Sequence, residues 1–259
     1  KGMNSLAVVI SVITQKGGVG KTTVVNALCA SLSKRRYRVL AIDMDPQGNL
    51  SLSFDADSDN AATIYDVLKG EALPIDSIQR QPVADIIPSN ILLSSIELEF
   101  TGKNREFLLS NIIEQVTGLY DIILIDSPPG LGILTINALT ASDYVIIPML
   151  PDIFSLQGLT LVYDTIEYIQ STVNKKLAIS GILVNRYMKR SKLHKEIYGT
   201  AQLICHKLNV NLFKTVIRNS KTLAEAQSIQ TDITEYSPKS SGVKDFNSLV
   251  TELEELNII

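Results

Sequence analysis

The chain has 259 residues, of which 45% are apolar, and a formal net charge of −3. This apolar content is ample for one large α/β domain or two small ones. The two cysteines, Cys29 and Cys205, exclude a disulfide framework and a cysteine-based metal site, and the apolar run over residues 6–13 is too short to span a membrane.

The first predicted elements are a buried strand over 6–14, a glycine-rich loop and a helix over 21–35. In such a strand–loop–helix unit, backbone N–H groups converge on phosphate oxygens and the helix N-terminus adds partial positive charge. Lys21 would reach the β- and γ-phosphates, and the Thr22 hydroxyl would bind Mg²⁺. The loop therefore predicts a nucleoside-triphosphate site that comprises Lys16, Gly17, Gly18, Val19, Gly20, Lys21, Thr22 and Thr23.

The remaining elements alternate between strand and helix. Further strands are predicted over 38–43, 84–87, 121–126, 143–149, 178–185 and 212–217, and helices over 105–117, 131–140, 155–171, 191–208 and 242–255. The acidic stretch 55–63 is predicted to be a surface loop. Continuous apolar strands, such as 120–125, are typical of a parallel sheet that is covered on both faces. We therefore expect an α/β fold with a doubly wound, mostly parallel sheet, and a ligand at the carboxyl ends of its strands.

Carboxylates follow two of these strands. Asp126 ends the strand over 121–126, where it can act on Mg²⁺ directly or through water. Asp45 follows the strand over 38–43 and can position the attacking water, and Asp43 points the same way on an extended chain. The alternatives are a turn opening at Asp45 before Pro46 and a strand-end cap at Asp126.

The loop departs from the general phosphate-binding pattern. Gln15 stands where the first glycine is usual, and Lys16 opens the loop. The run from Lys16 to Thr22 resembles the deviant Walker A motif, Lys-Gly-Gly-x-Gly-Lys-Thr, of the ParA/MinD family of ATPases. The resemblance continues in the runs 43–49, 125–129 and 223–226, and it is strongest to ParA/Soj-type partition proteins.

The resemblance implies roles for single residues. Asp45 is implied to be the catalytic carboxylate, and Lys21 of the loop is also implied to be catalytic. Asp43 is implied to lie in the same site beside Asp45. Lys16 is implied to cross an ATP-sandwich homodimer and touch the partner's phosphates, as an arginine finger in trans does. Asn185 is the implied adenine contact, although a satisfied loop asparagine is the alternative, and Asp152 resembles an acid near the dimer interface.

Charge is unevenly distributed along the chain. Residues 175–221 contain eleven basic residues and a single acid, Glu196, which gives this segment a net charge of +10. Because the whole chain has a net charge of −3, the other residues together carry −13. This asymmetry indicates either a face that binds a polyanion or a solvated helix surface. The resemblance places DNA contacts at Arg186, Lys189, Arg190 and Lys192, and at either Arg218 or Lys221, because the family's proline is missing before Arg218 and one residue is added after it. Any such contact should be to phosphates and independent of sequence.

We therefore expect a cytoplasmic, nucleoid-associated ATPase that needs ATP and Mg²⁺. It would dimerise on ATP, bind DNA non-specifically, and be released when a ParB-like partner stimulates hydrolysis. The alternatives are a MinD-like membrane-positioning ATPase, which the acidic C-terminal run disfavours, and a metabolic ATP-dependent enzyme. The sequence does not identify the cargo that such an ATPase would position.

One domain is expected over residues 3–259, without an N-terminal helix-turn-helix domain. Lys1 and Gly2 resemble an expression scar.

Overall fold

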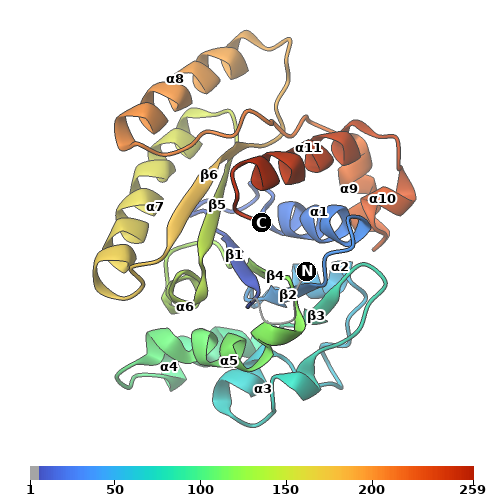
Figure 1. Cartoon of the computed structure of the whole chain (residues 1–259), viewed down its shortest axis with the longest axis vertical. Helices are drawn as coiled ribbons and strands as arrows, with labels where there is room; N and C mark the ends of the chain where they lie inside the picture. The colour runs from blue at the N-terminus through green and yellow to red at the C-terminus, as the bar shows by residue number, and fades with distance from the viewer. Residues whose placement is uncertain (1–5) are drawn as a thin grey trace.

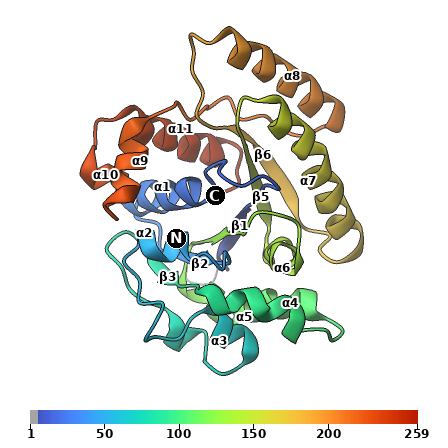
Figure 2. The same ribbon diagram turned by 180° about the vertical axis from the view of Figure 1, so that it is seen from behind.

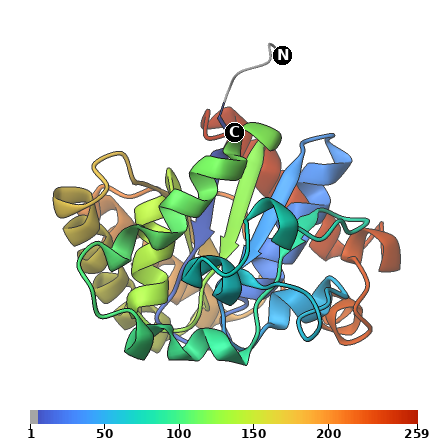
Figure 3. The ribbon, with the colours of Figure 1, turned by 90° about the horizontal axis from the view of Figure 1, so that it is seen from below.

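The structure is a computed structural model that describes residues 6–259. The expected scar at Lys1 and Gly2 lies outside this range. Six parallel strands form one sheet in the order β3-β2-β4-β1-β5-β6, and the arrowheads of the central strands point to the same edge in Figure 3. The strands are β1 Val8–Val12, β2 Val39–Asp43, β3 Asp85–Ile87, β4 Ile122–Asp126, β5 Tyr144–Met149 and β6 Ala178–Val184. The predicted α/β class with a parallel sheet is confirmed.

Helices cover both faces of the sheet (Figures 1 and 2). The helices are α1 Lys21–Lys34, α2 Asn49–Ser53, α3 Ile64–Lys69, α4 Ile96–Glu99, α5 Leu108–Val116, α6 Ile133–Ala141, α7 Ile153–Thr172, α8 Lys192–Leu208, α9 Lys221–Ser228, α10 Ile233–Tyr236 and α11 Ser241–Glu255. Short 3₁₀ turns span Ile75–Ser77, Ile91–Ser95, Arg105–Phe107 and Thr117–Leu119.

The alternation of side chains along each strand divides the core into two. On β1, Val9 packs with the apolar residues of α5, α6 and α7, whereas Ile10 and Val12 pack with those of α1 and α11. Both faces of the central strands are therefore buried, which explains their uninterrupted apolar sequences. The register pairs Val12 and Asp43 with Asp126, so the carboxyl ends of β1, β2 and β4 lie at one level of the sheet.

The prediction of a strand over 212–217 is wrong. The segment runs beside β6 but makes only isolated bridges, from Leu212 to Ile182 and from Arg218 to Tyr187. Between them, the backbone N–H groups of Lys214 and Thr215 donate to the carboxylate of Glu252 on α11, at 2.7 and 2.9 Å. A side chain from a distant helix therefore takes the hydrogen bonds that a seventh strand would need.

Candidate functional site

The glycine-rich loop joins β1 to α1 at the carboxyl edge of the sheet. Gly18 and Gly20 have φ angles of +73° and +95°, which side chains rarely adopt. A Cβ atom on Gly17 or Gly18 would meet no atom within 4 Å, so this side of the loop is open. A Cβ atom on Gly20 would lie 2.6 Å from the Asn185 side-chain nitrogen. The loop is thus held closely on one side and exposes backbone on the other.

A cavity of about 610 Å³ lies over this exposed backbone, which is a usual size for a ligand site. The Lys21 side chain is buried here, and burial lowers its pKa against the opposing effect of Asp126 and Asp45. The cavity is lined by Gly17, Gly18, Gly20, Lys21, Thr22, Thr23, Asp45, Gln47, Asn49, Leu52, Ser53, Pro129, Arg186, Ala224 and Ser228. The structure therefore brings six of the eight predicted loop residues into one cavity with Asp45, whereas Lys16 and Val19 do not line it.

Two buried carboxylates lie side by side beneath the loop. Asp43 and Asp126 are register partners at the ends of β2 and β4. Burial and the neighbouring Asp43 raise the pKa of Asp126, while Thr22 and Lys21 oppose this rise. Both carboxylate oxygens of Asp126 lack a regular hydrogen bond within the described chain. A buried, unpartnered carboxylate beside a threonine hydroxyl suits a divalent cation, because both supply the oxygen ligands that Mg²⁺ prefers.

Asp43 differs from Asp126 because its oxygens are occupied. Oδ2 accepts hydrogen bonds from the backbone N–H and the hydroxyl of Ser51, at 2.9 and 2.7 Å, and Oδ1 accepts one from the Asp45 N–H at 3.0 Å. Burial raises the pKa of Asp43 to about 6 despite these bonds. Asp43 therefore fixes the turn that carries Asp45. Sequence reasoning missed Ser51, since it lies in α2, outside every predicted element and motif, and a single serine gives no signal of its partner.

Asp45 is held by one of its oxygens and is free at the other. Oδ1 accepts the Gln47 N–H at 3.0 Å, and no hydrogen bond to Oδ2 forms among the atoms that the structure describes. The side chain lies in the cavity that Lys21 lines. Asp45 can thus present a carboxylate oxygen to a water molecule in the cavity, as the sequence predicts for the residue that positions the attacking water.

Lys16 points away from the cavity. Its Nζ lies 2.9 Å from Oδ2 of Asp152, which caps the N-terminus of α7, and 5.7 Å from the centre of the Phe154 ring. Partial burial raises the pKa of Asp152, but hydrogen bonds from Ser155 and Lys16 lower it overall. The structure therefore turns the side chain of Lys16, a predicted nucleotide-binding residue, away from the open side of the loop.

Asn185 is buried against the loop. Its Nδ2 donates to the Val19 carbonyl at 2.8 Å, and its Oδ1 accepts the Arg186 N–H at 2.8 Å. Both ends of the amide thus hold protein backbone, and a contact with adenine stays a prediction. A second cavity of about 330 Å³ opens between Asn185 and the turn that ends at Lys221.

The predicted DNA contacts fall into two groups. The side chains of Arg186, Lys189, Arg190, Lys192 and Lys221 are exposed to varying degrees. Arg218 instead pairs with Asp245 of α11, with 2.6 Å between Nη2 and Oδ1. Asp245 carried no signal in the sequence, because it is one of several acids in the C-terminal helix.

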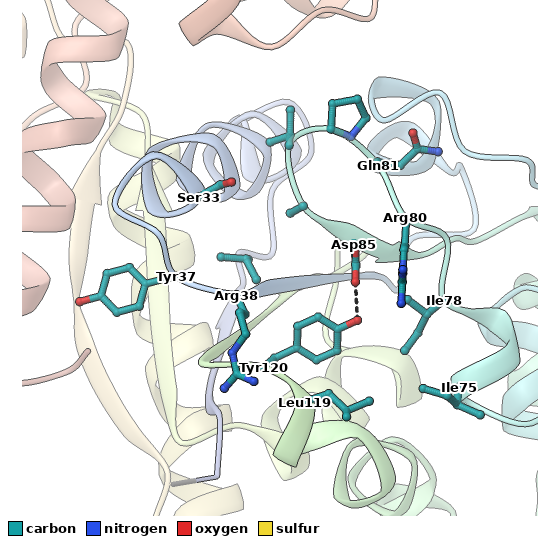
Figure 4. Close-up of a pocket in the computed structure, with 14 residues that line it drawn as sticks. Ser33, Tyr37, Arg38, Ile75, Ile78, Arg80, Gln81, Asp85, Leu119 and Tyr120 are labelled. Atoms are coloured by element: carbon teal, nitrogen blue, oxygen red, sulfur yellow. Dashed lines mark hydrogen bonds between the residues drawn. The ribbon is translucent and has the colours of Figure 1, made fainter. Parts of the chain in front are cut away.

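A further cavity of about 560 Å³ lies at the opposite, amino edge of the sheet (Figure 4). Its Tyr120 hydroxyl donates to Oδ2 of Asp85 at 2.7 Å, and burial raises the pKa of Tyr120. Arg38 is bound to Asp121 through Nε and Nη2. These groups are therefore engaged with protein partners, unlike the Asp126 carboxylate at the carboxyl edge.

No helix among residues 6–259 combines the length and the apolar character that a membrane crossing needs.

Comparison with known proteins identifies the relatives of this chain. Residues 7–179 match the family described as "AAA domain". The chain is 37% identical over 249 residues to the sporulation initiation inhibitor protein Soj of Bacillus subtilis, and the match covers 95% of this chain and 97% of that protein.

Two solved structures are also similar. The cobyrinic acid a,c-diamide synthase of Mycobacterium smegmatis, with bound ADP and magnesium, is 27% identical with a TM-score of 0.84, over 97% of both chains. A putative plasmid partition protein of Borrelia burgdorferi, bound to AMPPNP, is 25% identical with a TM-score of 0.82, over 96% of this chain and 99% of that one. The chain belongs to the ParA/MinD family of ATPases, among its ParA/Soj-type members.

Proposed function

We propose that this protein is an ATP-driven partition ATPase that segregates plasmid or chromosome DNA. ATP binding joins two copies face to face, the dimer binds DNA without sequence preference, and a ParB-like partner stimulates a slow hydrolysis that releases it. In this cycle the protein is cytoplasmic and associated with the nucleoid. The observation that carries the proposal is the orientation of Lys16. This lysine belongs to the phosphate-binding loop, yet its side chain points away from the cavity and towards Asp152.

The residues of the cavity suit ATP and Mg²⁺. The open amides of Gly17 and Gly18 and the Lys21 ammonium bind phosphates, and Thr22 and Asp126 hold the cation. A Mg²⁺ ion held there would neutralise the charge that develops on the phosphoryl oxygens. Asp43 holds the turn, and Asp45 orients a water. Phosphoryl transfer needs little beyond this positioning and charge neutralisation.

Dimerisation is supported by the surface around the cavity. Large apolar side chains lie more than half exposed on segments that follow the strand ends, namely Leu52, Ile91, Ile153 and Phe154. Exposed apolar side chains beside a ligand site are candidates for an interaction surface. A second copy that covers this edge would bury them and bring its Lys16 towards the first copy's phosphates.

The Lys16–Asp152 pair predicts a measurable competition. If Asp152 holds Lys16 in the monomer, Asp152→Asn should strengthen the ATP-dependent dimer about two- to thirty-fold, since each of the two exposed ion pairs that a dimer gives up contributes up to about 1 kcal/mol. Asparagine can still accept the Ser155 N–H that caps α7. Sedimentation with a slowly hydrolysed analogue measures the effect. A weaker dimer in this variant would mean that Asp152 acts within the dimer instead.

Binding to DNA is tested by a salt titration with random-sequence duplex DNA. With a slowly hydrolysed analogue, a dimer that neutralises about six phosphates should give a log–log slope of roughly −5. Binding with ADP should be negligible. Equal, negligible binding in every nucleotide state would mean that the exposed basic residues form only a solvated surface.

A metabolic ATP-dependent enzyme is the second candidate, favoured by the similarity to the cobyrinic acid a,c-diamide synthase. It would need a pocket for a second substrate next to the phosphates. The cavity at the amino edge lies at the far end of the strands, and its Tyr120 and Asp85 are bonded to each other. Nucleotide-dependent conversion of a supplied metabolite would support this candidate. In that case, DNA binding should not depend on the nucleotide.

A further inference from the structure

Ser51 of α2 joins two separate parts of the chain beneath the turn that carries Asp45. Its hydroxyl donates to Asp43 Oδ2 at 2.7 Å and accepts the Ser89 backbone N–H at 2.8 Å. Ser51, Asp43 and Ser89 are each at most 1% exposed. One buried hydroxyl therefore connects the end of β2 with the segment that follows β3.

The Ser89 end of this connection is held by the rest of the fold. The carbonyl of the preceding residue, Pro88, accepts the N–H of Ile64 at the start of α3, at 2.8 Å. A Cβ atom on Gly48 would lie 3.2 Å from the Ser89 carbonyl oxygen, so the turn and the Ser89 backbone are in close contact. Ser89 is therefore a fixed point against which the turn can be placed.

Asp43 passes this constraint to Asp45. Its Oδ1 accepts the Asp45 N–H at 3.0 Å, while its Oδ2 accepts the Ser51 hydroxyl. The Ser51 N–H also donates to Oδ2, at 2.9 Å, but this bond stays within the continuous stretch from β2 to α2 and can move with it. The hydroxyl bond to Ser89 instead ties that stretch to another strand's end. Loss of the hydroxyl would thus loosen Asp43 and leave a buried N–H without its acceptor.

We propose that Ser51 is a positioning residue for ATP hydrolysis, whose hydroxyl holds Asp43, and through Asp43 the turn, so that Asp45 faces the attacking water. Ser51 does not line the nucleotide cavity, and both hydroxyl bonds are made to protein groups. It therefore acts without touching ATP. The inference rests on the part proposed for Asp45 in hydrolysis, and not on dimerisation or DNA binding.

Ser51→Ala should slow single-turnover ATP hydrolysis about 10- to 100-fold, since a misplacement of about 1 Å can cost as much as 100-fold. Affinity for the slowly hydrolysed analogue should stay within about two-fold of the wild type, because Lys21 and Thr22 are untouched. The melting temperature should fall by about 2 to 6 °C, because the buried Ser89 N–H loses its acceptor.

Ser31→Ala is the matched control. Ser31 of α1 is also 1% exposed, and its hydroxyl makes no hydrogen bond within the part of the chain that the structure describes. This variant loses an equally buried hydroxyl from a helix, but one that holds nothing near Asp45. It should hydrolyse ATP at the wild-type rate.

Two further measurements separate positioning from general damage to the fold. If Ser51 acts through Asp45, the double variant Ser51→Ala with Asp45→Ala should be about as slow as Asp45→Ala alone, because the position of an absent carboxylate no longer matters. Amide hydrogen exchange over residues 44–48 reports the turn without any hydrolysis. It should be about three- to ten-fold faster in Ser51→Ala and unchanged in Ser31→Ala.

Four results would overturn the role of Ser51. These are wild-type turnover in Ser51→Ala, an equal decrease in Ser31→Ala, a double variant slower than Asp45→Ala by the full factor of the single change, and unchanged exchange over 44–48. Normal turnover in Asp45→Ala would instead reject the proposed part of Asp45, and with it any role of Ser51 in hydrolysis. A slow Asp45→Ala beside a normal Ser51→Ala would reject Ser51 alone.

Discussion

Replacing Asp45 by alanine is expected to slow ATP hydrolysis by about 100- to 1,000-fold, within the usual range for loss of a group that positions or deprotonates water. ATP binding and analogue-dependent DNA binding should persist, because Lys21 and the loop amides are untouched. Asp45 has one oxygen bound to the Gln47 N–H and the other free in the cavity. Single-turnover hydrolysis measures the decrease in rate, and equilibrium binding of a fluorescent ATP analogue measures the retained affinity.

Asp45→Asn is the matched control for this experiment. Asparagine can still accept the Gln47 N–H, so the turn keeps its shape while the carboxylate is lost. Both variants should be slow if the charge matters. A slow alanine variant beside a normal asparagine variant would assign Asp45 to turn geometry. Normal turnover in both would remove Asp45 from the mechanism.

Replacing Lys16 by alanine should abolish the ATP-dependent dimer at ordinary protein concentrations. Removal of a charge that contacts a partner's phosphates across a dry interface typically weakens association by about 100-fold or more. Binding of ATP to the monomer should change little, since Lys16 points towards Asp152 and away from its own cavity. Light scattering with the slowly hydrolysed analogue reports the dimer, and fluorescence titration reports nucleotide binding.

Lys239→Ala is a suitable control, because this exposed lysine lies in the segment between α10 and α11 and the variant loses the same charge. It should dimerise as the wild type does. A normal dimer in Lys16→Ala would refute a role in trans. A large decrease in the nucleotide affinity of the monomer would instead show that Lys16 contacts the nucleotide bound to its own protomer.

Local sequence was sufficient for the parallel sheet and the phosphate-binding loop. Each strand has its own apolar run, and the loop carries its glycines, Lys21 and Thr22 in one continuous stretch. The carboxylates Asp43, Asp45 and Asp126 were predictable for the same reason, since each comes at or just after a strand end. Parallel pairing then brings such residues together.

Features that depend on distant partners could not be predicted. The segment 212–217 has the composition of a strand, yet Glu252 takes two of its backbone donors. In the sequence, nothing distinguishes Arg218 from an unpaired surface cation, because only the packing of α11 places Asp245 beside it. In the same way, the orientation of Lys16 depends on where α7 begins relative to the loop. In all three cases one acid, from another element, decides the outcome.

The adjacent carboxylates of Asp43 and Asp126 also bear on how long the protein survives in a cell. Two acids buried on neighbouring strands oppose folding unless a proton or a cation compensates them. A ligand that brings Mg²⁺ to Asp126 binds the folded state alone, and so shifts the balance away from unfolded chains that proteases degrade. Nucleotide supply would then set the abundance of this ATPase as well as its activity.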